Sequence, residues 1–147
     1  MKRRQFLSLA LLSPALVRAQ SPAPDLNLVL VAGGHSNAKS MTPAEVRKLY
    51  LGVPVTIEGK ELLPLVNNTN LQVKEIFLQK VLFMSAQVYE RQLLSKQFRN
   101  GARTIEHVDL QALLATLQND PNAVSFMTPT TARANKNIKI LGDLWTA

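Results

Sequence analysis

The chain has 147 residues, a formal net charge of +7 and no cysteine. The absence of cysteine excludes disulfides, c-type haem attachment, iron–sulfur clusters, thiolate zinc sites and catalysis by a cysteine nucleophile. Four of the 17 basic side chains lie in the first 19 residues, which leaves 13 basic against 10 acidic side chains, and this small excess argues against nucleic acid as the main partner.

The N-terminal segment has the pattern of a secretory signal peptide. Lys2, Arg3 and Arg4 precede an apolar run of 12 residues at 6–17, and Val17-Arg18-Ala19 offers a cleavage site near Ala19. A helix of 12 residues is about 18 Å long, well short of the roughly 30 Å hydrocarbon core of a bilayer. A retained membrane anchor is therefore the weaker alternative.

These signals predict three regions and a location. Residues 1–19 are a cleaved signal peptide, residues 20–25 a linker, and residues 26–147 one periplasmic domain that does not insert into the membrane. The run Arg3-Arg4-Gln5-Phe6-Leu7 resembles the twin-arginine export signal. An ordinary secretory signal that contains two arginines is the alternative.

The first half of the domain predicts strands and one well-marked helix. Leu26 to Val31 is an apolar run typical of a buried strand, and it leads into a glycine turn. Thr42, Pro43 and Glu45 have the pattern of an N-cap, a first-turn proline and a capping box, for a helix that Gly52 ends. A small hairpin around Gly59 and a second core strand at 62–66 follow; Pro64 indicates an edge or an irregular stretch.

The second half alternates helices with strands. Polar residues 67–70 precede a helix with an apolar face, Ser85 caps a third helix that ends at Asn100-Gly101, and Asp109 opens a fourth. Strands are predicted at 123–127 and 138–141. The apolar positions expected for the three helices are Val73, Ile76, Phe77, Val81 and Met84, then Val88, Leu94 and Phe98, then Leu110, Leu113, Leu114 and Leu117. The alternation predicts an α/β domain with a mostly parallel sheet flanked by helices.

Three segments, taken in order, resemble a known family. They are Thr42 to Gly52 after a strand and a glycine turn, Leu65-Val66-Asn67 with the polar cluster and helix behind it, and Asp120 to Phe126. Their order and spacing are similar to the second lobe of the periplasmic phosphate-binding proteins of ABC importers. The resemblance implies a single periplasmic-binding-protein (type II) lobe and an exported, solute-binding-protein-like domain. It also implies phosphate or another small anion as ligand and a membrane transporter or sensor protein as partner; self-association is a further possibility.

The chain departs from this family where the ligand is held. The other lobe, with its phosphate loops, has no counterpart, and Asn67-Asn68-Thr69-Asn70 stands where the family usually has an arginine followed by Ser-Gly-Thr. Only Thr69 keeps a hydroxyl there. Two functions therefore stay open: a weak binder of phosphate or another small anion, and a periplasmic interaction or regulatory module that has lost ligand binding.

Two loops are candidate ligand sites. The helix start at Asn67, Asn68, Thr69 and Asn70 offers backbone N–H groups and the positive end of a helix dipole to an anion; an N-cap without a ligand is the alternative. The loop of Gly33, Gly34, His35 and Ser36 leaves the C-terminal end of a strand, where open α/β sheets bind ligands; a plain tight turn is the alternative.

No residue pattern indicates catalysis, a metal or a cofactor. His35 and His107 are the only histidines and have no metal-ligand spacing, and no nucleophile elbow is present. The basic group Arg91, Lys96, Arg99 and Arg103 is interpreted as a solvated face, with an anion clamp as the alternative. Trp145 either packs the C-terminal tail onto the domain or marks a contact surface.

Overall fold

The computed structural model describes residues 26–101 and 104–147, so the predicted signal peptide (1–19) and linker (20–25) lie outside the described residues. The elements, in chain order, are β1 (Leu28–Gly33), α1 (Pro43–Tyr50), β2 (Thr56–Ile57), β3 (Lys60–Glu61), β4 (Leu63–Asn67), α2 (Leu71–Ile76), the π-helical segment η1 (Phe77–Leu82), α3 (Ala86–Asn100), β5 (Ile105–His107), α4 (Leu110–Asn119), β6 (Ala123–Met127), α5 (Pro129–Arg133) and β7 (Ile138–Trp145).

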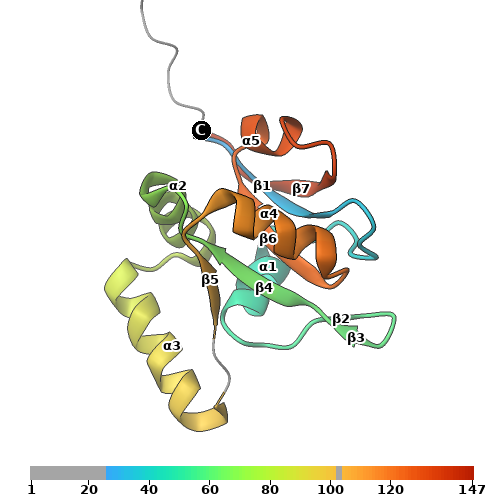
Figure 1. Cartoon of the computed structure of the whole chain (residues 1–147). Coiled ribbons are helices and arrows are strands. Elements are labelled where there is room, and N and C mark those ends of the chain that lie inside the picture. Colours follow the sequence, from blue (N-terminus) through green and yellow to red (C-terminus); the bar gives the residue numbers. More distant parts are fainter. Residues whose placement is uncertain (1–25, 102–103) are drawn as a thin grey trace, which may run out of the picture.

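Five strands form the main sheet, in the order β5-β4-β6-β1-β7 (Figure 1). β4 pairs in parallel with β5 and β6, whereas β1 pairs antiparallel with β6 and β7. Four of the five strands therefore point the same way, and β1 runs against them. The predicted α/β class, with a mostly parallel sheet flanked by helices, is confirmed; the direction of β1 was not anticipated.

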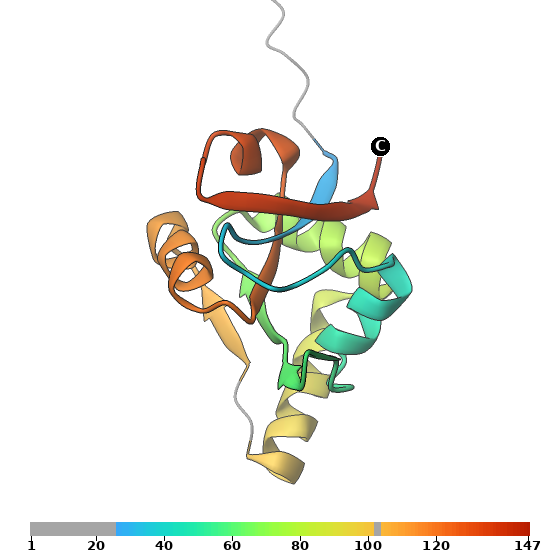
Figure 2. The same cartoon turned by 90° about the vertical axis from the view of Figure 1, so that its right-hand side faces the viewer.

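Helices cover both faces of the sheet, and each face has its own apolar core (Figure 2). Helices α1, α2 and η1 pack on one face, against Leu28, Leu30 and Phe126. Helices α4 and α5 pack on the other, against Val29 and Val31. Because successive side chains of a strand point to opposite faces, a strand covered on both sides must be apolar at every position. β1 meets this requirement with six consecutive buried residues.

Helix α1 begins and ends as its sequence predicts. The Thr42 hydroxyl accepts a hydrogen bond from the Glu45 N–H at 3.3 Å, and the Glu45 carboxylate accepts one from the Thr42 N–H at 2.7 Å. These bonds, the backbone bond from Thr42 first, hold the pKa of Glu45 below its usual value. Gly52 follows the helix at φ +95°, in the left-handed region that favours glycine.

Most of the predicted elements are present, with local differences. The hairpin around Gly59 forms as β2 and β3, and Trp145 pairs with Leu28 at the end of β7, which packs the C-terminal tail onto the sheet. β4 is an internal strand despite Pro64, because β5 pairs only with residues 65–67 and leaves Pro64 without a neighbour on that side. The helix expected to reach Met84 stops at Leu82.

Three parts of the fold were not predicted. β5 and α5 are short, at three and five residues, and the six residues of η1 follow a wider helical turn than the α-helix expected there. Helix α3 forms where expected, between Ser85 and Gly101, but its predicted apolar residues are exposed: Val88 at 36%, Leu94 at 54% and Phe98 at 89%. Tyr89, which was not singled out, is the residue of α3 that enters the core, at 2% exposure.

Candidate functional site

The carboxyl ends of three strands meet at one edge of the sheet. β4, β5 and β6 run in parallel, and a helix begins within four residues of each strand's end: α2, α4 and α5. Each helix start is capped by a polar side chain, from Asn70, Asp109 and Thr128 respectively. Open α/β sheets bind ligands at this edge, so the cluster of strand ends and helix starts is the candidate site.

The three helix starts surround a hollow of about 410 Å³, called here the edge hollow. Its polar lining consists of hydroxyl, amide and carboxylate groups, and its apolar lining consists of medium-sized side chains. The polar residues are Asn67, Thr69, Asn70, Asp109, Thr128 and Thr131, and the apolar ones are Val73, Val108, Leu110 and Met127. Asp109 is the one charged residue among these, so the described lining carries negative charge and no cation.

Asn67 braces the wall of the edge hollow. Its amide nitrogen donates to the Phe126 carbonyl oxygen at 2.8 Å, which ties β4 to β6. Its amide oxygen accepts from the N–H and from the hydroxyl of Thr69, at 3.0 and 2.7 Å. Asn67 is only 2% exposed. The side chain is thus committed to fixing the turn that leads into α2, and Thr69 is the neighbour whose position it sets.

The capping side chains occupy many of the N–H groups that an anion would use. The Asn70 oxygen accepts from the Gln72 and Val73 N–H groups at 2.9 and 3.3 Å. Asp109 likewise accepts from the Ala112 N–H at 2.9 Å. At the very start of these helices, the N–H groups of Leu71 and Leu110 have no hydrogen-bond partner among the described residues. Of the two residues, Leu110 lines the edge hollow and Leu71 does not, so the Leu110 N–H is the donor left for a solute there.

Asn68 points away from the other members of its cluster. It does not line the edge hollow, and its N–H donates to the His107 carbonyl oxygen at 2.9 Å. Within the described residues, the Asn68 side-chain oxygen and the His107 ring nitrogen Nε2 are buried without a hydrogen-bond partner. Since the side chains of successive residues in an extended chain point to opposite faces, those of Asn67 and Asn68 cannot both contact a ligand on the same face of the sheet.

The second predicted loop lies at the opposite edge. Because β1 is antiparallel to β6, the loop after Gly33 lies beside the turn that precedes β6: the Ser36 hydroxyl donates to the Pro121 carbonyl oxygen at 2.6 Å. A Cβ on Gly33 would lie 2.0 Å from the Leu117 carbonyl oxygen, so this glycine permits close packing of β1 against α4. Gly34 donates to the Asn137 carbonyl oxygen at 2.7 Å, and His35 is exposed.

The eight predicted site residues therefore do not form one site. Asn67, Thr69 and Asn70 line the edge hollow, Asn68 lies beside it, and Gly33, Gly34, His35 and Ser36 are at the other edge. Sequence reasoning did not assign Asp109, Thr128 and Thr131 to this site. Thr128 directly follows β6, Asp109 comes two residues after β5, and each caps the next helix. The strand-end signal was available for Thr128, because the strand at 123–127 was predicted; Asp109 was read only as a helix start, because β5 was not predicted.

Two buried tyrosines carry the large pKa shifts. Burial raises the pKa of Tyr50 well above its ordinary value, and burial followed by the Glu106 charge raises that of Tyr89. Both hydroxyls are therefore neutral at physiological pH, and neither residue lines the edge hollow. Among the described residues no group of three or more acidic or histidine side chains has the arrangement of a metal site.

Within residues 26–101 and 104–147, no helix combines the length and the apolar character that crossing a membrane requires. No protein-family model matches the chain, and no curated protein matches it. Among solved structures, an ABC-type phosphate transport receptor from Vibrio cholerae is similar over 78% of this chain, with a TM-score of 0.47 and 11% sequence identity. The similar region spans 45% of that receptor, less than half of its length.

Proposed function

We propose that this chain is an exported, one-lobe solute-binding domain that holds phosphate or another small oxyanion weakly in the edge hollow. The proposal rests on one observation, the convergence of three parallel strand ends and three helix starts on the hollow. The sequence resemblance to the second lobe of phosphate-binding proteins supports an oxyanion as ligand and a transporter or sensor as partner. The pattern of residues 1–19 supports export to the periplasm.

Weak binding follows from the lining. A dissociation constant of 1 mM corresponds to about 4 kcal/mol and 1 μM to about 8 kcal/mol. The N–H of Leu110 and the one hydroxyl hydrogen that the Thr128–Thr131 pair leaves over contribute about 1 kcal/mol for each hydrogen bond, and an exposed helix start about 0.3–1 kcal/mol. No arginine of residues 26–101 and 104–147 lines the hollow to bind the anion with two hydrogen bonds, and the Asp109 carboxylate repels it. We expect a dissociation constant of about 0.1 mM or weaker.

Isothermal titration of the exported protein with phosphate, sulfate and acetate tests the proposal. The informative variant is Asp109→Asn, which removes the opposing charge and keeps a capping oxygen; we expect it to tighten oxyanion binding several-fold. Thr69→Val removes the hydroxyl that donates to Asn67 and should weaken binding, because the turn that forms the wall of the hollow loses this bond. The matched control is His35→Ala at the opposite edge, which should change nothing. If His35→Ala changes the binding heat and the variants in the edge hollow do not, the binding site is the Gly33 loop and not the edge hollow.

A second candidate function is an interaction or regulatory module that binds no solute. The capping bonds of Asn70, Asp109 and Thr128 favour it, because they already satisfy N–H groups of all three helices. This alternative predicts no binding heat and no thermal stabilisation with any of the three anions at 10 mM or more, for the original protein and for Asp109→Asn alike.

A further inference from the structure

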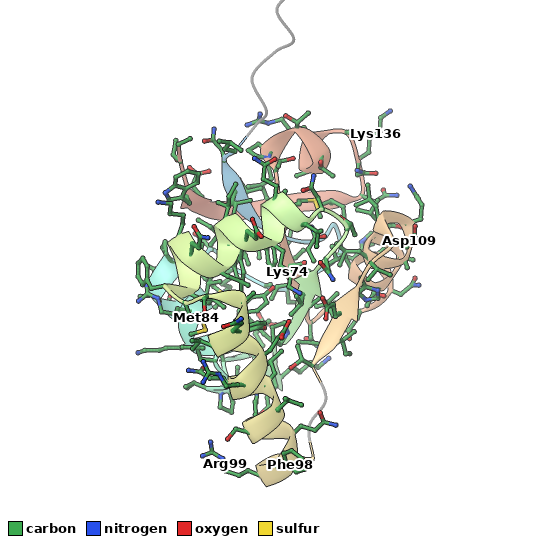
Figure 3. All side chains as sticks on the ribbon, turned by 90° about the vertical axis from the view of Figure 1, so that its left-hand side faces the viewer. Lys74, Met84, Phe98, Arg99, Asp109 and Lys136 are labelled. Carbon is green, nitrogen blue, oxygen red and sulfur yellow. The ribbon has the colours of Figure 1, made fainter. Side chains whose placement is uncertain are left out.

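Helix α3 stands away from the body of the domain. It has 15 residues, yet over 86–99, where burial is described, Tyr89 is the one buried residue. In Figure 3 its far end, marked by Phe98 and Arg99, extends beyond the rest of the described chain. A helix of this length is only marginally stable in water without packing along one face. The exposed part of α3 is therefore a surface that gains stability when something covers it.

A groove runs between α3 and the end of α1. It encloses about 620 Å³ and is called here the α3 groove, defined by Leu51, Gly52, Val88, Arg91, Lys96 and Arg99. Val88, Arg91 and Arg99 follow one another along one flank of α3, at helical spacings of three and eight residues. Leu51 forms the facing wall and is 38% exposed. The groove thus has apolar groups from both walls, Leu51 and Val88, and three cations from α3.

Gly52 makes room for the Lys96 side chain in the α3 groove. A Cβ at Gly52 would lie 2.5 Å from Cε and 2.6 Å from Nζ of Lys96, so the lysine side chain lies directly over the glycine backbone. Any larger residue at position 52 would push the ammonium group away. The absence of a side chain at Gly52 therefore places the Lys96 charge inside the groove.

The charge of the groove is unbalanced. Arg91, Lys96 and Arg99 line it, and no acidic residue of the described part of the chain does. The ion pair found within the described residues joins Lys74 to Glu106, away from this lining. Arg91 donates to the Gln87 carbonyl oxygen and Arg99 to the Ser95 hydroxyl, both on α3 itself. None of the three cations thus has a carboxylate partner within residues 26–101 and 104–147.

From these observations we infer that the α3 groove docks an acidic amphipathic helix of a partner protein. A helix lying along α3 presents side chains at matching intervals, so apolar residues meet Leu51 and Val88 while carboxylates meet the three cations. The lining runs along α3 from Val88 to Arg99, about 16 Å at 1.5 Å per residue, a length that suits a docked helix. A second copy of this chain, docked face to face, would place the three cations against the same three cations.

The α3 groove shares no lining residue with the edge hollow. Partner docking therefore does not depend on whether the hollow holds an oxyanion, and a failure of one proposal leaves the other standing. Where both hold, the domain has a solute site at the carboxyl edge of the sheet and a protein contact on α3.

The test uses the exported protein and a synthetic 18-residue helix with leucines on one face flanked by glutamates, compared with the same peptide carrying lysines in place of glutamates. We expect the acidic peptide to bind at least tenfold more tightly than the basic one. Reversing charge with Arg91→Glu and Arg99→Glu should weaken the acidic peptide at least tenfold. The matched control reverses Arg133 and Lys136, which are also exposed, and should leave its affinity unchanged. Circular dichroism checks that both double variants melt like the original.

Four outcomes would overturn the inference. The first is equal or absent binding of the two peptides, and the second is equal weakening by the control pair. The third is binding to vesicles of 30% phosphatidylserine that Arg91→Glu with Arg99→Glu abolishes, which would make the α3 groove a membrane contact. The fourth is a dimer in sedimentation equilibrium that the same pair dissociates, which would make the occupant a second copy of the chain.

Discussion

The Tyr50 hydroxyl donates a hydrogen bond to the Leu65 carbonyl oxygen at 2.8 Å, which fixes helix α1 to the middle of strand β4. The same carbonyl accepts from the Ser125 hydroxyl at 3.0 Å. Tyr50 also packs edge-on against Phe77, with ring centroids 4.8 Å apart. One buried carbonyl thus joins α1, β4 and β6.

Replacing Tyr50 by phenylalanine keeps the ring packing and removes this hydrogen bond. We expect a loss of about 1 kcal/mol in the free energy of unfolding, since Leu65 keeps its bond from Ser125. Urea denaturation followed by circular dichroism measures it. A variant that is as stable as the original would show that the bond contributes nothing net.

Alkaline pH should destabilise the fold through the two buried tyrosines. Their pKa values are raised in the folded state, by burial first, so above the ordinary tyrosine value of about 10 the unfolded chain loses protons that the folded chain keeps. Their contribution is complete below pH 10 and declines as the pH rises beyond it. Thermal melts between pH 9 and 11 should fall less steeply for Tyr89→Phe. An identical slope for the two proteins would contradict this account.

The capping box of α1 gives a local test of stability. Thr42→Ala removes the hydroxyl that accepts from Glu45 and should cost about 1 kcal/mol. Thr42→Ser keeps the hydroxyl and is the matched control, expected to stay within a few tenths of a kcal/mol. Chemical denaturation measures the free energy of unfolding of both variants. Equal values for Thr42→Ala and Thr42→Ser would mean that water caps the helix as well as the Thr42 hydroxyl does.

Gly33 should tolerate no side chain. A Cβ there would lie 2.0 Å from the backbone oxygen of Leu117, whereas the nearest atom to a Cβ on Gly142 lies at 3.5 Å. We expect Gly33→Ala to cost about 1–3 kcal/mol or more, because backbone atoms of α4 must move, and Gly142→Ala to cost little. Comparable melting temperatures for the two variants would mean that α4 shifts freely.

Export is tested on the protein made by its own host. Mass spectrometry of the periplasmic fraction should find a chain that begins at Gln20, after cleavage behind Ala19. Replacing Arg3 and Arg4 by lysine should block export if the twin-arginine route is used. Unchanged export of that variant assigns the chain to the general secretory route, and an intact Met1 would refute cleavage itself.

Short-range signals in the sequence predicted what depends on neighbouring residues. The caps at Thr42, Ser85 and Asp109, the stops at Gly52 and Gly101, and the strands at β1, β4 and β6 follow from hydrogen bonding or periodicity within a few positions. β5 was missed because Ile105, Glu106 and His107 neither alternate nor form an apolar run. Its place is set by pairing with β4 alone.

Features that depend on contacts between distant parts of the sequence could not be predicted, for a different reason. Nothing local records that β1 runs against β6, and this direction places the Gly33 loop and Asn70 at opposite edges. Asn67 was predicted to bind a ligand, because a side-chain amide can bind a solute or stabilise a turn equally well. The hydrogen bond from its amide nitrogen to the Phe126 carbonyl oxygen decides for the structural role, and this bond cannot be read from the sequence. Exposure of Leu94 and Phe98 likewise depends on what packs beside α3.

The position of β1 between β6 and β7 also bears on how the chain reaches its folded state. The first strand of the domain finds both of its neighbours in residues 123–127 and 138–145, so its two edges stay unpaired until nearly the whole chain has been made. Pairing over such sequence separations is slow. In a nascent chain, β1 therefore has no sheet neighbours until residue 145 has been made, and this apolar strand needs protection from aggregation until then.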